Sequence, residues 1–140
     1  MEVQTQVLQA VSKFLNIPIG QLPEKGGTVM ELAPSSTPRR FFNGESYDQM
    51  SVLILSKGKS QKTTLESLNT ACNKCRTLNL PSGEKWQIKL IEISTCPNYV
   101  GQEKNSDGIM WIYSCILTVN FYNMEGFKCC LLYTSDAADE

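Results

Sequence analysis

Two cysteines spaced for metal or redox chemistry are the first residues in the chain that suggest a function. Cys72 and Cys75 are separated by two residues, the spacing of half a zinc knuckle or of a thiol redox pair. A structural zinc site would need two further ligands, but the chain contains no histidine, and Cys96 and Cys115 are isolated in the sequence. Both cysteines of the pair instead fit the apolar seam of a predicted helix, where cysteine behaves as a small hydrophobic residue. We therefore predict that the pair belongs to the core and holds no metal.

Two other groups of residues could bind a ligand, and each has a simpler structural interpretation. Gly58 with Lys57 and Lys59 faintly resembles a phosphate-binding loop, but the P-loop pattern is absent. A solvated turn between a strand and a helix is favoured there. Trp111 and Tyr113 could line a ligand pocket, but their strand spacing favours positions in the core.

No pattern of acids and bases indicates an enzyme. The absence of histidine removes the commonest general base. Asp48, Glu92 and Asp107 form no carboxylate pair that the sequence reveals. We therefore identify no catalytic residues from the sequence.

A basic and aromatic cluster lies in the middle of a polar stretch, 34–46, that we expect to be a loop or an irregular arm. Connections of this length in a compact domain are often functional or disordered. The cluster could bind phosphate or stack on a base, but one basic pair is little charge for a nucleic-acid site. We favour aromatic contacts with the same domain or with a neighbouring subunit. The cluster consists of Arg39, Arg40, Phe41 and Phe42.

Hydrophobic periodicity predicts two amphipathic helices. The first should end near Asn16, because Pro18 disfavours helical geometry before it and cannot donate the next backbone hydrogen bond. The second begins after Ser60, a residue type that suits an N-cap, and ends before Pro81. The apolar residues at helical spacing are Val3, Val7, Leu8, Val11, Phe14 and Leu15 in the first helix, and Leu65, Leu68, Cys72 and Cys75 in the second.

Four strands are predicted, over 28–33, 46–59, 86–95 and 109–123. The second has apolar residues on both faces, so we expect a central strand or a strand whose second face meets a partner. In the third, the apolar pattern changes phase near Leu90, which indicates a β-bulge or burial on both sides. The fourth alternates without a break. The turn-rich linker before it, 97–108, is expected to be a long polar loop.

These elements predict an α+β fold with the order αββαββ. A four-stranded, mainly antiparallel sheet would carry both helices on one face. The 140 residues leave room for one domain with its own core. No apolar run approaches the roughly 20 residues needed to cross a bilayer, and the first residues do not resemble a secretory signal.

The last residues of the chain, 130–140, differ in character from the rest. The stretch from Cys130 to Asp139 resembles the translation of a transposon-based sequencing adapter. We therefore expect a natural domain over 1–129, followed by a non-native tail. Without the three acidic residues of the tail, 13 basic and 11 acidic residues remain, and the net charge changes from −1 to about +2. This charge gives no strong nucleic-acid footprint.

Residues 2 to about 123 resemble the tail-terminator proteins of long-tailed bacteriophages, in particular the group often labelled minor capsid protein in phages of Gram-positive bacteria. The resemblance lies in the layout: the helix VQTQVLQAVSKFL, the segment TVMELAP, a strand that enters a helix through a short basic turn, and a final strand pair. The connection within that pair follows a Pro-x-x-x-Gly-x-acid pattern at Pro97, Gly101 and Glu103.

The resemblance implies a structural virion protein that forms a ring, usually a hexamer, with no enzymatic activity and no cofactor. Such a ring caps the finished tail tube and joins it to the head–tail connector. Its partners would be further copies of itself, the tail-tube protein and the connector protein, with no membrane and no specific nucleic acid. It would be assembled in the host cytoplasm and located in the virion, at the head–tail interface.

The family's contact residues are not a fixed motif, so loop length and composition alone suggest the interface. One predicted contact is the cluster Arg39, Arg40, Phe41 and Phe42, and the other is Tyr99, Gln102, Glu103 and Lys104.

Two alternative functions stay open, with an enzyme of unknown type as a distant third. Another head–tail joining protein, such as a head-closure or tail-completion factor, would be distinguished by the position of its gene between the connector and tail-tube genes. A small single-stranded nucleic-acid-binding module would carry aromatic and basic side chains together on an exposed sheet face. The apolar face of the fourth strand has no Lys or Arg, which argues against this module.

Overall fold

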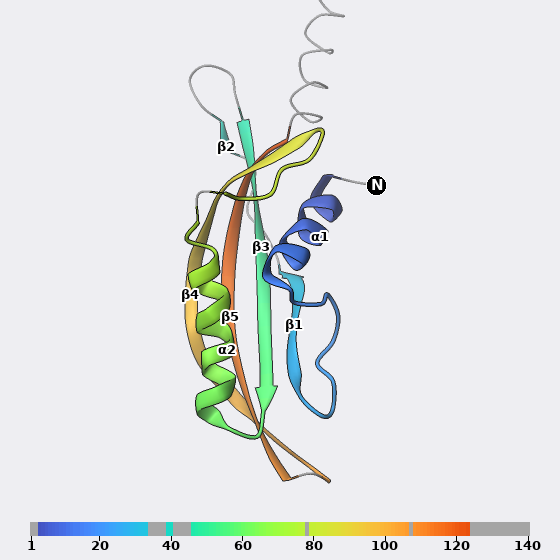
Figure 1. The fold of residues 1–140 in the computed structure, drawn as a ribbon, viewed down its shortest axis with the longest axis vertical. Coiled ribbons are helices and arrows are strands. Elements are labelled where there is room, and N and C mark those ends of the chain that lie inside the picture. The colour runs from blue at the N-terminus through green and yellow to red at the C-terminus, as the bar shows by residue number, and fades with distance from the viewer. Residues whose placement is uncertain (1–2, 34–38, 41–45, 78, 107, 124–140) are drawn as a thin grey trace, which may run out of the picture.

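The computed structural model describes residues 3–33, 39–40, 46–77, 79–106 and 108–123 (Figure 1). Two helices lie on one face of an antiparallel sheet of four long strands, and the order αββαββ is the predicted one. A two-residue strand, β2 (Arg39–Arg40), is additional. It pairs with the start of β3 (Ser46–Gly58), inside the stretch that was predicted to be a loop.

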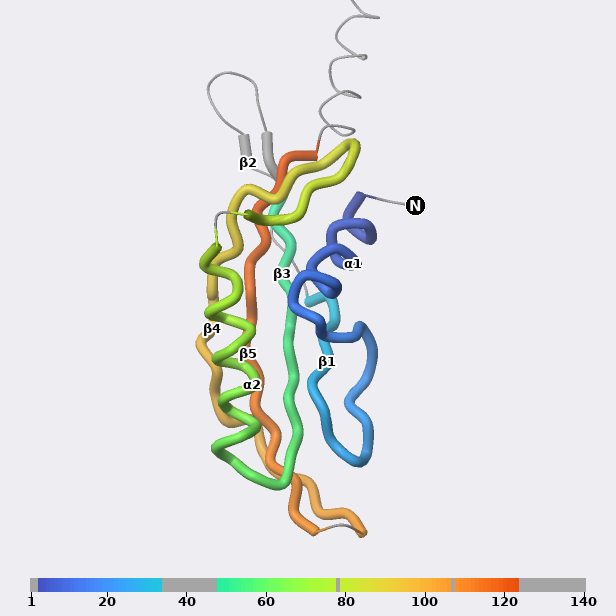
Figure 2. Tube along the Cα trace, in the orientation of Figure 1, coloured from blue at the N-terminus to red at the C-terminus, as the bar shows by residue number. Residues whose placement is uncertain are grey.

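The long strands lie in the order β1-β3-β5-β4. β1 (Gly27–Ala33) and β4 (Trp86–Asn105) form the two edges, and β3 and β5 (Gly108–Asn123) are central. All neighbours are antiparallel, so β3 and β4, which both pair with β5, run parallel to each other. The helix that connects them crosses the same face of the sheet as the first helix (Figures 1 and 2). The central place of β3 confirms the prediction from its two apolar faces.

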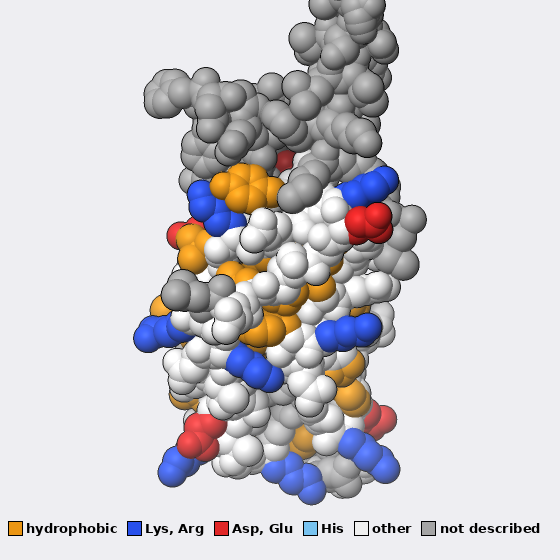
Figure 3. Space-filling view, turned by 45° about the horizontal axis from the view of Figure 1, so that its top comes forward, with side chains coloured by type: hydrophobic (Ala, Val, Ile, Leu, Met, Phe, Trp, Pro, Cys, Tyr) orange, Lys and Arg blue, Asp and Glu red, His pale blue; other side chains and the backbone are white. Residues whose placement is uncertain are grey.

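The core fills the space between the sheet and the helices α1 (Val3–Leu15) and α2 (Gln61–Lys74). Both helices turn their apolar stripes toward the sheet, as their periodicity predicts. Viewed obliquely in Figure 3, the molecule shows hydrophobic side chains in the middle and charged side chains toward the margins. The fully buried core residues are Val7, Val11, Met30, Met50, Val52, Ile54, Leu68, Cys115, Leu117, Val119 and Phe121.

Local chemistry sets the end of α1 and the start of α2 where the sequence predicts them, whereas α2 ends at Lys74, earlier than the predicted end before Pro81. Asn16 adopts the left-handed conformation with φ of 57°, which asparagine tolerates better than most residues. The Ile17 amide then donates to the Ser12 carbonyl at 3.0 Å, which closes the end of α1 as a Schellman motif. At the start of α2, the Ser60 hydroxyl accepts a hydrogen bond from the Thr63 amide at 3.3 Å. Neither described helix is long and apolar enough to cross a membrane.

The β-bulge predicted near Leu90 is present. The pairing register of β4 against β5 shifts between Ile88 and Leu90. One extra residue reverses the side on which the following side chains lie, so Ile91 joins Ile88 in the core at 5% exposure. Leu90 is 48% exposed on the opposite face.

This register makes a matched pair of substitutions informative. We expect Ile91→Ala to lower the free energy of unfolding by about 2–5 kcal/mol, because it leaves a cavity in the core. Leu90→Ala should change it by no more than about 0.5 kcal/mol, because Leu90 lies on the surface. Urea denaturation of both variants checks this. A larger loss from Leu90→Ala than from Ile91→Ala would show that the register is wrong.

Candidate interaction surface on the β4–β5 hairpin

The connection between β4 and β5 is a long hairpin, so the prediction of a polar loop over 97–108 is wrong. β4 continues to Asn105, and β5 begins at Gly108. Pro97 lies in a register shift between Thr95 and Asn98, where it occupies no ladder position. An edge strand tolerates proline at such a shift, because no ladder hydrogen bond is lost there. We refer to residues 98–114 as the hairpin.

The outer part of the hairpin projects from the body of the domain. β3 ends at Gly58, which pairs with Trp111, so the residues between Gln102 and Met110 extend past the end of β3. Figures 1 and 2 show this projection below the lower ends of β1, β3 and α2.

One side of the hairpin carries three aromatic rings in contact. Tyr99 pairs with Tyr113, and their ring centroids lie 5.7 Å apart in an edge-on arrangement. The ring of Trp111 is 6.3 Å from that of Tyr99, within the range of aromatic attraction. Ile109 and its cross-strand partner Lys104 continue this side toward the tip. We call Tyr99, Lys104, Ile109, Trp111 and Tyr113 the aromatic face. Tyr99 is 52% exposed and Ile109 is 46% exposed.

The prediction that Trp111 and Tyr113 belong to the core is wrong for Trp111 and only partly right for Tyr113. Both are partly exposed. Tyr113 packs against the margin of the core, and its hydroxyl donates to Oε1 of Gln61 at 3.3 Å. α2 begins at Gln61, level with Tyr113. Beyond Tyr113, α2 therefore no longer covers the core side of β5.

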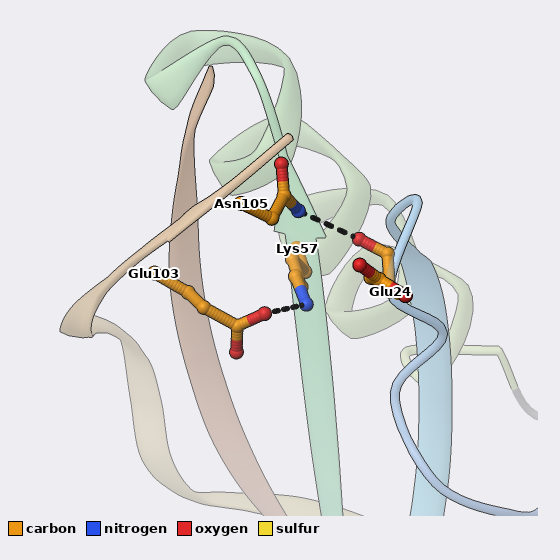
Figure 4. A network of polar contacts seen from close by, with 4 residues as sticks. All are labelled: Glu24, Lys57, Glu103 and Asn105. Atoms are coloured by element: carbon orange, nitrogen blue, oxygen red, sulfur yellow. Dashed lines mark hydrogen bonds and ion pairs between the residues drawn. The ribbon is translucent and has the colours of Figure 1, made fainter. Parts of the chain in front are cut away.

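The other side of the hairpin is fastened to the body of the domain (Figure 4). Nζ of Lys57, near the end of β3, lies 2.7 Å from Oε1 of Glu103. Asn105 Nδ2 donates to the backbone carbonyl of Glu24 at 3.1 Å. We call Glu24, Lys57, Glu103 and Asn105 the brace. The Lys57 side chain is only 3% exposed and that of Glu103 is 49% exposed, so the bond joins a buried ammonium to a carboxylate in contact with solvent.

Gly26 allows the segment before β1 to approach the brace. Its φ of +100° lies in a region that side-chain-bearing residues rarely adopt. A Cβ at this position would lie 2.8 Å from the carbonyl oxygen of Lys57 and 2.9 Å from Cε of Met110. Any other residue would therefore push the segment that contains Glu24 away from β3.

The two predicted sets of interface residues lie at opposite ends of β3. One set, Tyr99, Gln102, Glu103 and Lys104, lies on the hairpin. Tyr99 and Gln102 are level with the last residues of β3, and Glu103 and Lys104 lie beyond Gly58. Of the other set, Arg39 and Arg40 form β2 and pair with Tyr47 and Ser46 at the start of β3. Phe41 and Phe42 lie outside the described residues. The 13 residues of β3, at about 3.3 Å each, separate its ends by about 40 Å, so the two sets form no single site.

Within the hairpin set the side chains divide between the two sides. Tyr99, Gln102 and Lys104 share the side of Trp111, whereas Glu103 turns to the brace. Sequence analysis did not assign Trp111, Ile109 and Tyr113 to this surface. The unbroken alternation of the fourth predicted strand indicated on which side of the sheet these three residues lie. It did not indicate where along the strand α2 stops covering that side.

The sheet face without helices carries a second apolar surface. Leu53 and Ile116 are cross-strand partners in β3 and β5. Leu55 and Ile112 lie on the same side of these strands, and all four residues are partly exposed. We call Leu53, Leu55, Ile112 and Ile116 the open sheet face.

Carboxylates flank the open sheet face on both edges. Glu31 of β1 is the cross-strand partner of Leu53, and Glu92 of β4 is the partner of Thr118 in β5, on the same side of the sheet. Both glutamates are exposed. The surface therefore has carboxylates at both margins, and along its middle Ser114 lies between Ile112 and Ile116.

The cysteine pair packs in the core, as predicted. Cys72 and Cys75 are 5% and 4% exposed at the end of α2, and Cys115 of β5 is fully buried. Burial raises the pKa of the Cys72 and Cys115 thiols, and raises the pKa of Cys75 to about 11. Among the described residues, no three His, Cys, Asp or Glu side chains form a group that could hold a metal ion.

The basic stretch between β3 and α2 forms a strand-to-helix turn, as predicted, but the prediction that it is solvated is wrong for Lys57, which is buried. The Lys57 amine donates to Oε1 of Glu103 at 2.7 Å. The hydroxyls of Ser56 and Thr64 bond within the protein, to Thr28 at 3.0 Å and to the Ser60 carbonyl at 2.7 Å.

The chain matches no protein-family model, and a comparison with curated proteins found no match. The geometry of the hairpin and the sheet therefore carries the functional argument.

The brace predicts a difference between two neighbouring substitutions. Glu103→Gln removes the counter-charge of a buried lysine, and we expect a loss of about 1–2 kcal/mol in unfolding free energy, reduced because solvent screens the exposed carboxylate. Lys104→Gln, on the exposed side, should change it by less than about 0.5 kcal/mol. Urea denaturation measures both, and equal effects would mean that the ion pair does not fasten the hairpin.

Burial of the thiols predicts selective labelling. In the folded protein at pH 8, a maleimide should modify Cys96, which is exposed, much faster than Cys72, Cys75 or Cys115. The thiolate is the reactive form, and a raised pKa keeps a buried thiol protonated at this pH. Peptide mass spectrometry after timed labelling distinguishes the sites. Rapid modification of Cys75 would contradict its place in the core.

Proposed function

We propose that this protein is a structural component of a bacteriophage virion: a tail terminator that forms a homo-oligomeric ring, caps the tail tube and joins it to the head connector. The order αββαββ agrees with the layout on which the resemblance to tail terminators rests. The subunits of the ring would number six if this protein follows the family, and the further partners would be the tail-tube protein and the connector protein.

The observation that carries the proposal is the braced, projecting hairpin with its aromatic face. Tyr99, Val100 and Ile109 are each about half exposed, and all three belong to the hairpin. On the surfaces of soluble proteins, clustered apolar side chains mark interaction sites more often than scattered ones do. A projection that is fixed in place supports a role in assembly, because little conformational freedom is lost when it binds.

The open sheet face supports assembly independently. A chain with two different apolar surfaces, on opposite sides of one sheet, can bind a second copy through unlike surfaces. Contacts of this kind generate a ring when the rotation between copies closes, and a filament when it does not. A terminator must stop growth, so the closed ring is the form that the proposal requires.

The proposal predicts rings of the purified protein. Negative-stain electron microscopy should show annular particles, and light scattering at micromolar concentration should give the mass of several 15.7 kDa chains. Added to purified tail tubes, the protein should bind their ends and stop elongation. A single-chain mass at all concentrations, with no binding to tube ends, would contradict the proposed function.

A single-stranded nucleic-acid-binding function is the second candidate, and the aromatic face favours it. Three rings lie on the same side as Lys104, and bases stack on such rings with little sequence preference. The candidate predicts a gel shift of a labelled oligonucleotide that weakens steeply between about 50 and 200 mM salt. One lysine on this face is little charge, so we expect no shift at the higher salt concentration.

A further inference from the structure

We infer that the aromatic face of one copy docks on the open sheet face of the next copy. The inference rests on the proposed ring and adds the two surfaces that build it. The occupant of each surface is therefore a second copy of this chain.

The two surfaces cannot contact each other within one chain. The aromatic face lies on the helix side of the sheet, beyond the start of α2, and the open sheet face lies on the opposite side. A two-fold dimer through either surface would leave the other exposed. A contact between unlike surfaces covers both in every copy, except at the ends of an unclosed chain.

The charges of the two surfaces are complementary. Lys104 is the described charged residue of the aromatic face, and it is exposed. The open sheet face is flanked by Glu31 and Glu92. Glu103, the acidic neighbour of Lys104 in the chain, is turned to the other side of the hairpin and bonded to Lys57. The alternation of β4 therefore places the Glu103 carboxylate on the side away from the surface that would meet Glu31 and Glu92.

The brace also sets the direction of the projection. Lys57, at the end of β3, and the Glu24 carbonyl, before β1, hold the hairpin at two points. Its aromatic side is thus presented in one orientation relative to the sheet. A fixed angle between the donor and acceptor surfaces is what makes a chain of contacts close after a definite number of copies. A stable contact of this kind buries at least about 1,000 Å² in total.

Two variants that each lose one surface test the inference. The hairpin variant, Tyr99→Ser with Ile109→Ser, changes two exposed residues and keeps the open sheet face. The sheet variant, Ile116→Lys, keeps the aromatic face, and its long side chain can extend toward solvent from a partly exposed site. Circular dichroism and thermal melting establish that each variant is folded. Each alone should be a single chain, with self-association weakened at least about tenfold, because anchors at the centre of an interface carry most of its energy.

The decisive sample is the mixture of the two folded variants. The sheet variant supplies an intact aromatic face and the hairpin variant an intact open sheet face, so a 1:1 mixture should form pairs and stop there. Light scattering would then report two chains and no larger particle. A mixture that stays single-chain, or a variant that alone assembles like the wild type, would overturn the inference.

Charge reversal gives a second test that leaves the apolar residues in place. Lys104→Glu alone and Glu31→Lys alone should each weaken assembly at low salt, because like charges then meet across the contact. The two variants mixed, or both changes in one chain, should restore it. If each single change weakens assembly, but neither the mixture nor the chain with both changes restores it, the proposed pairing of these surfaces is contradicted.

The outcomes separate this inference from the proposed function. If the wild type and both surface variants all assemble into rings, the result supports the proposed function and overturns the inference. A wild type that remains a single chain overturns both. Binding of a labelled single-stranded oligonucleotide that the hairpin variant alone loses, with no assembly of the wild type, would assign the aromatic face to nucleic acid.

Discussion

The burial of one face of β5 beneath the two helices determines where the other surfaces of the domain lie. Alternate residues from Cys115 to Phe121 enter the core, and the pleat sends the residues between them to the opposite face. Because β5 is longer than α2 can cover, its core side emerges again at Tyr113 and Trp111. The core, the aromatic face and the open sheet face are therefore three consequences of one strand with a fixed alternation.

A hairpin that projects from a domain usually gains mobility, and the brace opposes this. The buried ammonium of Lys57 would be costly without a counter-charge, so its bond to Glu103 couples the position of the hairpin to the stability of the sheet. The carboxylate remains partly solvated, which makes the pair weaker than a fully buried one. The same arrangement leaves Lys104 as the exposed charge on the opposite side. In the proposed assembly, the ion pair thus holds the projection, and the alternation of β4 keeps Glu103 off the side that carries Lys104.

Features governed by neighbours in the chain were predictable from the sequence. Pro18 and Ser60 indicated helix ends. The two apolar faces of β3 indicated a central strand or a strand that meets a partner, and the phase change near Leu90 indicated a bulge or burial on both sides. The hairpin was missed because Pro97, Gly101 and the polar residues between them resemble a loop, while pairing with β5 holds them extended. The brace joins residues 46 positions apart, and no local pattern reveals such a bond. The exposure of Trp111 depends on where α2 begins above the sheet, which is a tertiary property.

In the proposed ring, unlike surfaces of neighbouring copies meet. This contact can be tested with a photo-crosslinking amino acid in place of Tyr99, irradiated in the assembled protein and mapped by mass spectrometry. We expect links between chains, from position 99 to peptides that contain Leu53 or Ile116. Links from hairpin to hairpin, or an assembly in which position 99 links to no other chain, would contradict it.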